Sequence, residues 1–164
     1  MAKARRALPS PLRDTAAPLA RAVVIHSLAH AKAALAAAAA EGVAVELWSA
    51  EGAAAYAGAG WFKAVLEAAR REVPGARSTA VLDCADLPGY ALGAFRIGIE
   101  AVCFRGAAKI AAKLADIAAQ EGRRCLRRRP RRALDLGHAA DPLAACQAWL
   151  RGERRGRTPA DPRR

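Results

Sequence analysis

The chain has 164 residues and a formal net charge of +12, a length that suits one domain with its own core. Its charge is uneven: residues 1–20 carry +3, residues 123–164 carry +9, and the stretch between them is neutral. The most apolar run, residues 28–40, is short and contains His30 and Lys32. This excludes a membrane-spanning helix there, and the basic N-terminus lacks the apolar region of a secretory signal.

The composition predicts three segments. Residues 1–20 contain Pro9, Pro11 and Pro18 and predict a disordered basic arm, residues 21–152 a single α/β domain, and residues 153–164 a disordered Arg-rich tail. No C-x-x-C pair occurs among the four cysteines, Cys84, Cys103, Cys125 and Cys146. Free thiols and a cytoplasmic location are therefore expected.

The first half of the domain predicts strands alternating with helices. Residues 21–27 contain the continuous apolar run of a buried strand. Ser27 is suited to cap an alanine-rich helix over residues 28–41, which Gly42 ends. Residues 43–49 predict a second strand, residues 51–60 a small and flexible loop, and residues 61–73 an amphipathic helix.

The second half continues the alternation. Residues 78–86 predict a third strand, and Pro88 opens a helix that ends near Arg96. Residues 101–104 predict a fourth strand and residues 107–121 a helix. The remaining segments are less regular: 124–127 is a candidate fifth strand, 127–132 (RRRPRR) is a charged break, 133–136 is ambiguous, and 141–152 predicts a short helix with Asp141 as its N-cap.

Such alternation predicts an α/β fold with a parallel sheet of four to five strands joined by right-handed crossovers. Two architectures fit, an open doubly wound sheet and half of a (β/α) barrel. In both, ligands bind at the carboxyl ends of the strands. Polar side chains gather there, and the predicted site consists of His26, Ser49, Glu51, Asp83, Asp86 and Arg105.

Asp83 is the central residue of this predicted site. It directly follows the apolar pair Val81-Leu82, so we expect its carboxylate to be partly buried and to need a partner, which Arg105 would supply. Asp83 and His26 are the candidate proton carriers for acid–base chemistry. The alternative is a structural ion pair or a cap on the turn that follows.

Other motifs are weaker. Gly58 and Gly60 precede a helix whose N-terminus would suit an anion, but they match no nucleotide-binding fingerprint, so no cofactor is expected. A mobile lid or a plain turn is the alternative for this loop. His26 and His30 are four residues apart, but no third ligand has a fixed spacing, so no metal is expected either. Cys84 and Cys103 are expected to serve in packing.

Two functions remain open. The first is binding of a small polar or anionic metabolite at the strand ends; any enzyme activity would be acid–base chemistry of the lyase or isomerase kind. The second is non-enzymatic association with nucleic acid through the arginine-rich flanks, although no aromatic residue is interleaved in residues 123–132. A domain that serves only in interactions is a third hypothesis. The oligomeric state is left open.

The segments 41–50 (EGVAVELWSA) and 98–104 (GIEAVCF) each lead from a glycine turn into a strand. In this respect the stretch from Val23 to Phe104 resembles (β/α)-barrel aldolases of the keto-deoxy-sugar-phosphate type. The resemblance places the position of their Schiff-base lysine near Cys103, which cannot form that base. Their glutamate base would fall near Glu46, although the spacing from the preceding glycine differs by one residue from that of the family. The resemblance thus implies the fold without the Schiff-base chemistry.

Overall fold

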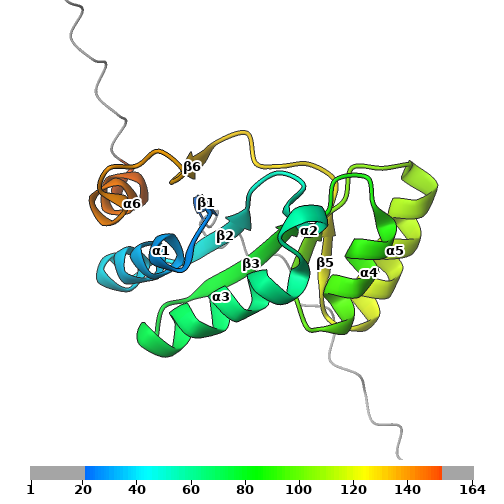
Figure 1. Cartoon of the computed structure of the whole chain (residues 1–164), viewed down its shortest axis with the longest axis horizontal. Helices are drawn as coiled ribbons and strands as arrows, with labels where there is room; N and C mark the ends of the chain where they lie inside the picture. The colour runs from blue at the N-terminus through cyan, green and yellow to red at the C-terminus, as the bar shows by residue number, and fades with distance from the viewer. Residues whose placement is uncertain (1–20, 153–164) are drawn as a thin grey trace, which may run out of the picture.

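The computed structural model describes residues 21–152, and in this range six parallel strands alternate with helices (Figure 1). The strands are β1 (Arg21–Ile25), β2 (Val45–Ser49), β3 (Ser78–Asp83), β4 (Ala101–Cys103), β5 (Arg124–Leu126) and β6 (Ala133–Asp135). The helices are α1 (Leu28–Glu41), α2 (Ala53–Tyr56), α3 (Ala59–Glu72), α4 (Pro88–Arg96), α5 (Ala108–Gln120) and α6 (Pro142–Arg151).

The α/β class with a parallel sheet is confirmed, with six strands in place of the predicted four to five. The additional strand is β6, in the segment that the sequence left ambiguous. Both β5 and β6 are only three residues long, which is too short for a periodic pattern to develop. The predicted arms, residues 1–20 and 153–164, lie outside the described residues.

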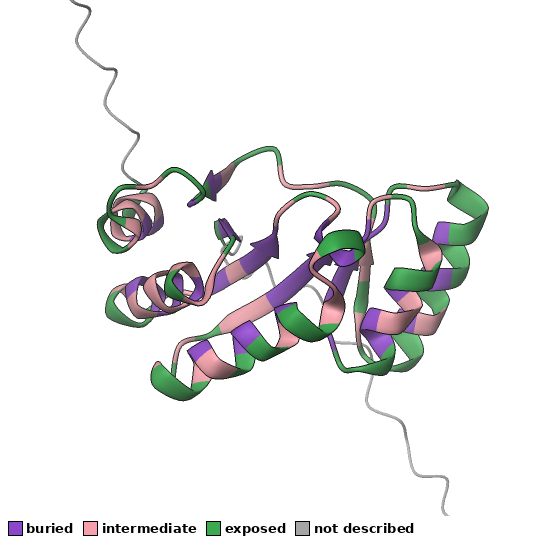
Figure 2. Ribbon diagram, viewed as in Figure 1, coloured by how far each residue is buried: buried purple, intermediate pink, exposed green. Residues whose placement is uncertain are grey.

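All helices of the described range pack on one face of the sheet. The strand order is β5-β4-β3-β2-β1-β6, so the chain moves in a single direction from β1 to β5. Right-handed crossovers that all move in one direction place their helices on the same face. The main core cluster accordingly contains the buried residues of α1 to α6 together with Val23, Leu47 and Leu82 (Figure 2). The open sheet thus resembles half of a barrel rather than a doubly wound sheet.

The opposite face of the sheet forms a second, smaller cluster. Its buried members come from strands alone: Ala22, Val24, Trp48, Val81, Ala101 and Cys103. Trp48 is the largest of them and is only 2% exposed. We call this the strand-only face, because no helix within residues 21–152 contributes to its cluster.

Residues 127–132, which we call the strap, connect β5 at one edge of the sheet to β6 at the other (Figure 1). Five strand spacings of about 4.8 Å separate these edges. Seven residue steps span at most about 25 Å, so the strap must be nearly extended. Its middle residue Arg129 lies over the Trp48 ring, 5.4 Å from the ring centroid. The predicted charged break therefore crosses the strand-only face.

The helix ends separate into two groups. Ser27 Oγ accepts a hydrogen bond from His30 N, and Asp141 Oδ1 accepts one from Ala144 N, so α1 and α6 are capped as predicted. Gly42, at a φ of 65°, ends α1. In contrast, α3, α4 and α5 have no side-chain cap. The short helix α2, also without a side-chain cap, follows β2 and leads into α3, while α4 and α5 follow β3 and β4, so these helices begin on the side of the carboxyl edge. None of the helices described is long and apolar enough to cross a membrane.

Candidate functional site at the carboxyl edge of the sheet

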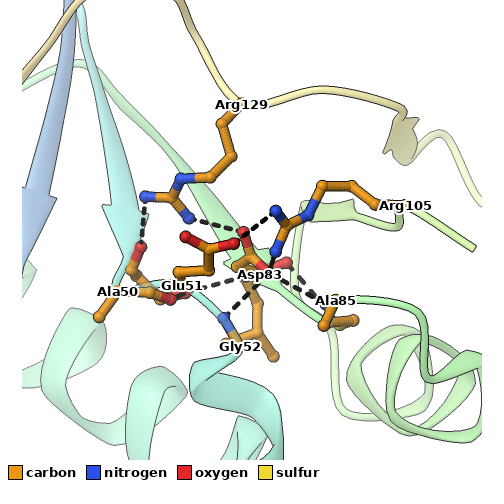
Figure 3. A network of polar contacts seen from close by, with 10 residues as sticks. Ala50, Glu51, Gly52, Asp83, Ala85, Arg105 and Arg129 are labelled. Atoms are coloured by element: carbon orange, nitrogen blue, oxygen red, sulfur yellow. Dashed lines mark hydrogen bonds and ion pairs between the residues drawn. The ribbon is translucent and has the colours of Figure 1, made fainter.

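Asp83, the last residue of β3, is the centre of a polar network at the carboxyl edge (Figure 3). Its side chain is 0% exposed. Oδ1 accepts hydrogen bonds from Gly52 N at 3.0 Å, from Ala85 N at 2.9 Å and from Arg105 Nη2 at 3.3 Å. Oδ2 accepts one from Arg129 Nη1 at 2.6 Å. A buried carboxylate needs this degree of hydrogen bonding to remain charged.

The charge state of Asp83 follows from this environment. Burial alone would raise the pKa of Asp83. The hydrogen bond from Arg129, the backbone donors of Ala85 and Gly52 and the positive charge of Arg129 outweigh burial and hold the pKa below its usual value. Asp83 is therefore a carboxylate near neutral pH, and its function in this network is to hold the cations around it.

Arg105 joins the buried carboxylate to the surface. The guanidinium donates through Nη2 to Asp83 and through Nη1 to Glu51 Oε1, which is 2.5 Å away. The Arg105 side chain is 34% exposed and that of Glu51 is 67% exposed. The predicted pairing of Asp83 with Arg105 is thus present. Because an arginine has five N–H groups, Arg105 has further donors beyond these two side-chain contacts.

Arg129 approaches Asp83 from the strap, opposite Arg105 (Figure 3). Besides its bond to Asp83, it donates through Nη2 to Ser49 O at 3.1 Å. Its guanidinium also lies over Trp48, as described above. One side chain therefore ties the strap to the ends of β2 and β3. Arg129 is a member of the network that sequence reasoning missed, since nothing in RRRPRR marks which arginine points inward.

Ala85 holds an unusual backbone conformation beside Asp83. Its φ is +48°, the one positive value among non-glycine residues within 21–152. Its N–H binds Asp83, and its carbonyl accepts the Arg105 backbone N–H at 2.6 Å. Conformations of this kind cost free energy and are frequent at functional sites. The network of Asp83 provides the contacts that hold this one in place.

The other residues predicted for this site lie at the end of β2, in the turn after β3 and at the start of α3. Ser49 is 1% exposed, accepts a hydrogen bond from Asp83 N at 2.9 Å and donates to Ala50 O, so it is a structural contact of β3. Asp86 is exposed in the turn before α4. Gly58 is the N-cap of α3 at a φ of 83°, and Gly60 lies inside that helix. The predicted flexible loop is partly helical, since it contains α2.

His26 belongs to a separate pair at the β1 end of the edge. Its Nε2 lies 2.7 Å from Asp135 Oδ1, which also accepts from Gly137 N. His30 Nδ1 accepts a hydrogen bond from His26 N. Burial, followed by the charge of His26, lowers the pKa of His30. The two predicted proton carriers, His26 and Asp83, thus have different partners, and Asp135 is a second contact that the sequence did not identify.

Metal-ligating groups and thiols give no second candidate site in the part of the chain that the structure describes. Within residues 21–152, no three His, Cys, Asp or Glu side chains are grouped so as to hold a metal ion. All four cysteines are free, and Cys84, Cys103 and Cys146 are buried. Burial raises the pKa of Cys84 to about 12 and that of Cys103 to about 11. Such thiols are poor nucleophiles, as the predicted packing role requires.

Most arginines between 123 and 132 bind other parts of the same chain. Arg124 pairs with Glu46 at 3.0 Å, and Arg127 donates to the carbonyls of Phe104 and Gly106. The remaining contacts are those of Arg123 with Glu121, Arg129 with Asp83, and Arg132 with the Trp149 ring. These arginines are therefore part of the fold. Association with nucleic acid stays a prediction that depends on the termini, outside the described residues.

The two positions singled out by the resemblance to aldolases lie on the strand-only face. Cys103 is buried there. Glu46 Oε2 accepts a hydrogen bond from Trp48 Nε1 at 3.1 Å, while Oε1 pairs with Arg124. Glu46 thus has two structural partners. The comparisons with known proteins found no match, neither with the family models nor with the curated proteins, and the resemblance remains a prediction.

Proposed function

We propose that this chain binds a small polar molecule with an anionic group at the carboxyl edge, against the exposed parts of Arg105 and Arg129. The observation that carries the proposal is that buried Asp83 holds two arginines, Arg105 and Arg129, at this edge with 34% and 21% of their side chains exposed. A guanidinium already fixed by a carboxylate loses little side-chain freedom when it binds a ligand. Its planar donors suit a carboxylate or a phosphate.

Two further features support an anion at this edge. Three helices, α3, α4 and α5, begin there without side-chain caps. Their N-termini carry partial positive charge and backbone donors, which favour negative groups. In addition, Arg127 contacts backbone carbonyls rather than carboxylates. Its positive charge is therefore not neutralised by these two contacts.

The roles within the proposed site differ from those expected from sequence. Asp83 has four hydrogen-bond donors and a lowered pKa, so it is an anchor for Arg105 and Arg129 rather than a proton carrier. Glu51 and Asp86 are exposed and are suited to accept hydrogen bonds from ligand hydroxyl groups. His26, the other predicted proton carrier, pairs with Asp135 rather than with this network.

The test is a binding measurement with the purified chain. Isothermal titration with inorganic phosphate, a small dicarboxylate and a sugar phosphate should reveal saturable binding of at least one anion. Arg105→Gln removes a cation from the site and should weaken that binding about tenfold or more. Arg105→Lys keeps the charge but not the planar donors and should weaken it less.

The matched control is Arg96→Gln, because Arg96 is exposed at the C-terminal end of α4, away from the carboxyl edge. It removes the same charge and should leave binding unchanged. If Arg96→Gln and Arg105→Gln weakened anion binding equally, the net charge of the protein would explain the binding, and the proposal would be contradicted. Absence of saturable binding with all three anions would also contradict it.

A further inference from the structure

A hollow on the protein surface lies at the start of α4, on the loop that follows Asp83. It is lined by Leu87, Pro88, Gly89 and Tyr90 at the start of α4 and has a volume of about 390 Å³. Leu87 is 38% exposed and Tyr90 is 45% exposed. The buried residues of α4 are Ala91, Ala94 and Phe95, so Leu87 and Tyr90 are not needed for the core. Their apolar surfaces are available to a ligand.

The hollow and the arginines share one loop. The carbonyl of Ala85 accepts the backbone N–H of Arg105, and the carbonyl of Cys84 accepts that of Leu87 at 3.0 Å. Leu87 is only two residues after Ala85, so their Cα atoms are at most about 7 Å apart. The backbone of Arg105 and the first residue of the hollow are therefore held by the same short loop.

A second aromatic residue lies on the neighbouring helix. Tyr56, which is 70% exposed, ends α2, and α2 contacts α4. The same α2 begins after Gly52, whose N–H binds Asp83. Exposed apolar residues on α2 and α4 thus flank the loops that hold the arginines. Solitary exposed apolar residues are ordinary, but here they adjoin a hollow and a fixed cationic group.

We infer that the ligand of this site is a small amphiphilic anion: one anionic group that binds Arg105, joined to an aromatic or short aliphatic group that fills the hollow beside Tyr90. This inference rests on the proposed function and specifies its ligand class. A volume of about 390 Å³ is at the small end of ligand pockets and accommodates a single ring. Asp86, which is exposed and lies between Ala85 and Leu87 in the chain, disfavours a second anionic group.

The experiment compares two probes by isothermal titration, inorganic phosphate and phenyl phosphate, on the full chain. Phenyl phosphate should bind about tenfold more tightly than phosphate. Tyr90→Ala should remove that gain while leaving phosphate binding unchanged, whereas Arg105→Gln should weaken both probes. Ile97→Ala is the matched control, because Ile97 follows the other end of α4 and is 38% exposed; it should change neither affinity.

The outcomes separate the two proposals. Equal affinity for the two probes, or equal weakening of both by Tyr90→Ala in a folded protein, overturns the amphiphilic ligand but leaves the anion site standing. If neither probe binds, both the anion site for phosphates and this inference are overturned. Circular dichroism of each variant establishes that the comparison is made between folded proteins.

Discussion

Asp83 and Asp135 each end a strand near the same edge of the sheet, yet their environments differ. The Asp83 side chain is 0% exposed and has four hydrogen-bond donors, while that of Asp135 is 62% exposed and pairs with His26 and Gly137 N. Burial makes every partner of Asp83 necessary, whereas water can replace the partners of Asp135. The comparison teaches that burial, more than residue type, decides which strand-end carboxylate organises the edge.

The largest expected effect follows from removing the buried carboxylate. Asp83→Ala leaves Arg105 and Arg129 without the charge that holds them and should lower the free energy of unfolding by roughly 3 to 5 kcal/mol. Urea denaturation followed by circular dichroism measures this. Asp86→Ala, an exposed carboxylate three residues away, should change it by less than about 0.5 kcal/mol. Similar effects of both variants would mean that the network contributes little.

Removing the strap contact should have the next largest effect. Arg129→Gln removes the charged bond to Asp83 and the contact with Trp48, and should cost about 2 kcal/mol. In a chain that also carries Trp61→Phe and Trp149→Phe, Trp48 is the one remaining tryptophan. Its fluorescence emission should move to longer wavelength as the ring becomes more exposed to water. Arg128→Gln, at the exposed neighbour in the strap, is the control and should leave emission unchanged. If the emission wavelength of Trp48 did not change in Arg129→Gln, the strap would still cover Trp48 without this contact, which would contradict the prediction.

The pH dependence of stability tests the charge of buried Asp83. The pKa of Asp83 is lower in the folded chain than its usual value of 3.8, so its charge stabilises the fold above that pH. This stabilisation is lost as the pH falls through the folded pKa. Stability measured between about pH 5 and pH 2.5 should therefore decline less steeply in Asp83→Asn than in the unsubstituted chain. Parallel curves would contradict the lowered pKa.

The smallest effect is expected at the exposed pair. Asp135→Asn removes the charge partner of His26, and since the two side chains are 62% and 36% exposed, the cost should stay below about 1 kcal/mol. Urea denaturation followed by circular dichroism measures this cost. A cost above that of Arg129→Gln would reverse the contrast between Asp83 and Asp135.

The sequence predicts local features of this fold well. Ser27, Gly42 and Asp141 mark helix ends by their own chemistry, and the pairing of Asp83 with Arg105 follows from two adjacent parallel strands. The alternation of elements likewise suffices for the α/β class, because short links between strand and helix leave few other arrangements.

Long-range contacts were not accessible in this way. Arg129 of the strap contacts Asp83, 46 residues away in the chain, and Asp135 of β6 contacts His26, 109 residues away. Periodicity reports burial within an element, not which distant segment lies against it. The sequence of the strap indicates only a charged break, since a run of arginines has the same pattern whether it faces solvent or a buried carboxylate.

The central claim, an anion site formed by arginines that Asp83 holds, is tested most directly by NMR. The Nε–H signals of the arginine side chains are recorded while inorganic phosphate is added at constant ionic strength. The proposal predicts saturable shifts of the Arg105 and Arg129 signals with a common dissociation constant, and no such shift for Arg96. Unmoved signals of Arg105 and Arg129, or shifts of all three arginines to the same extent, would contradict it.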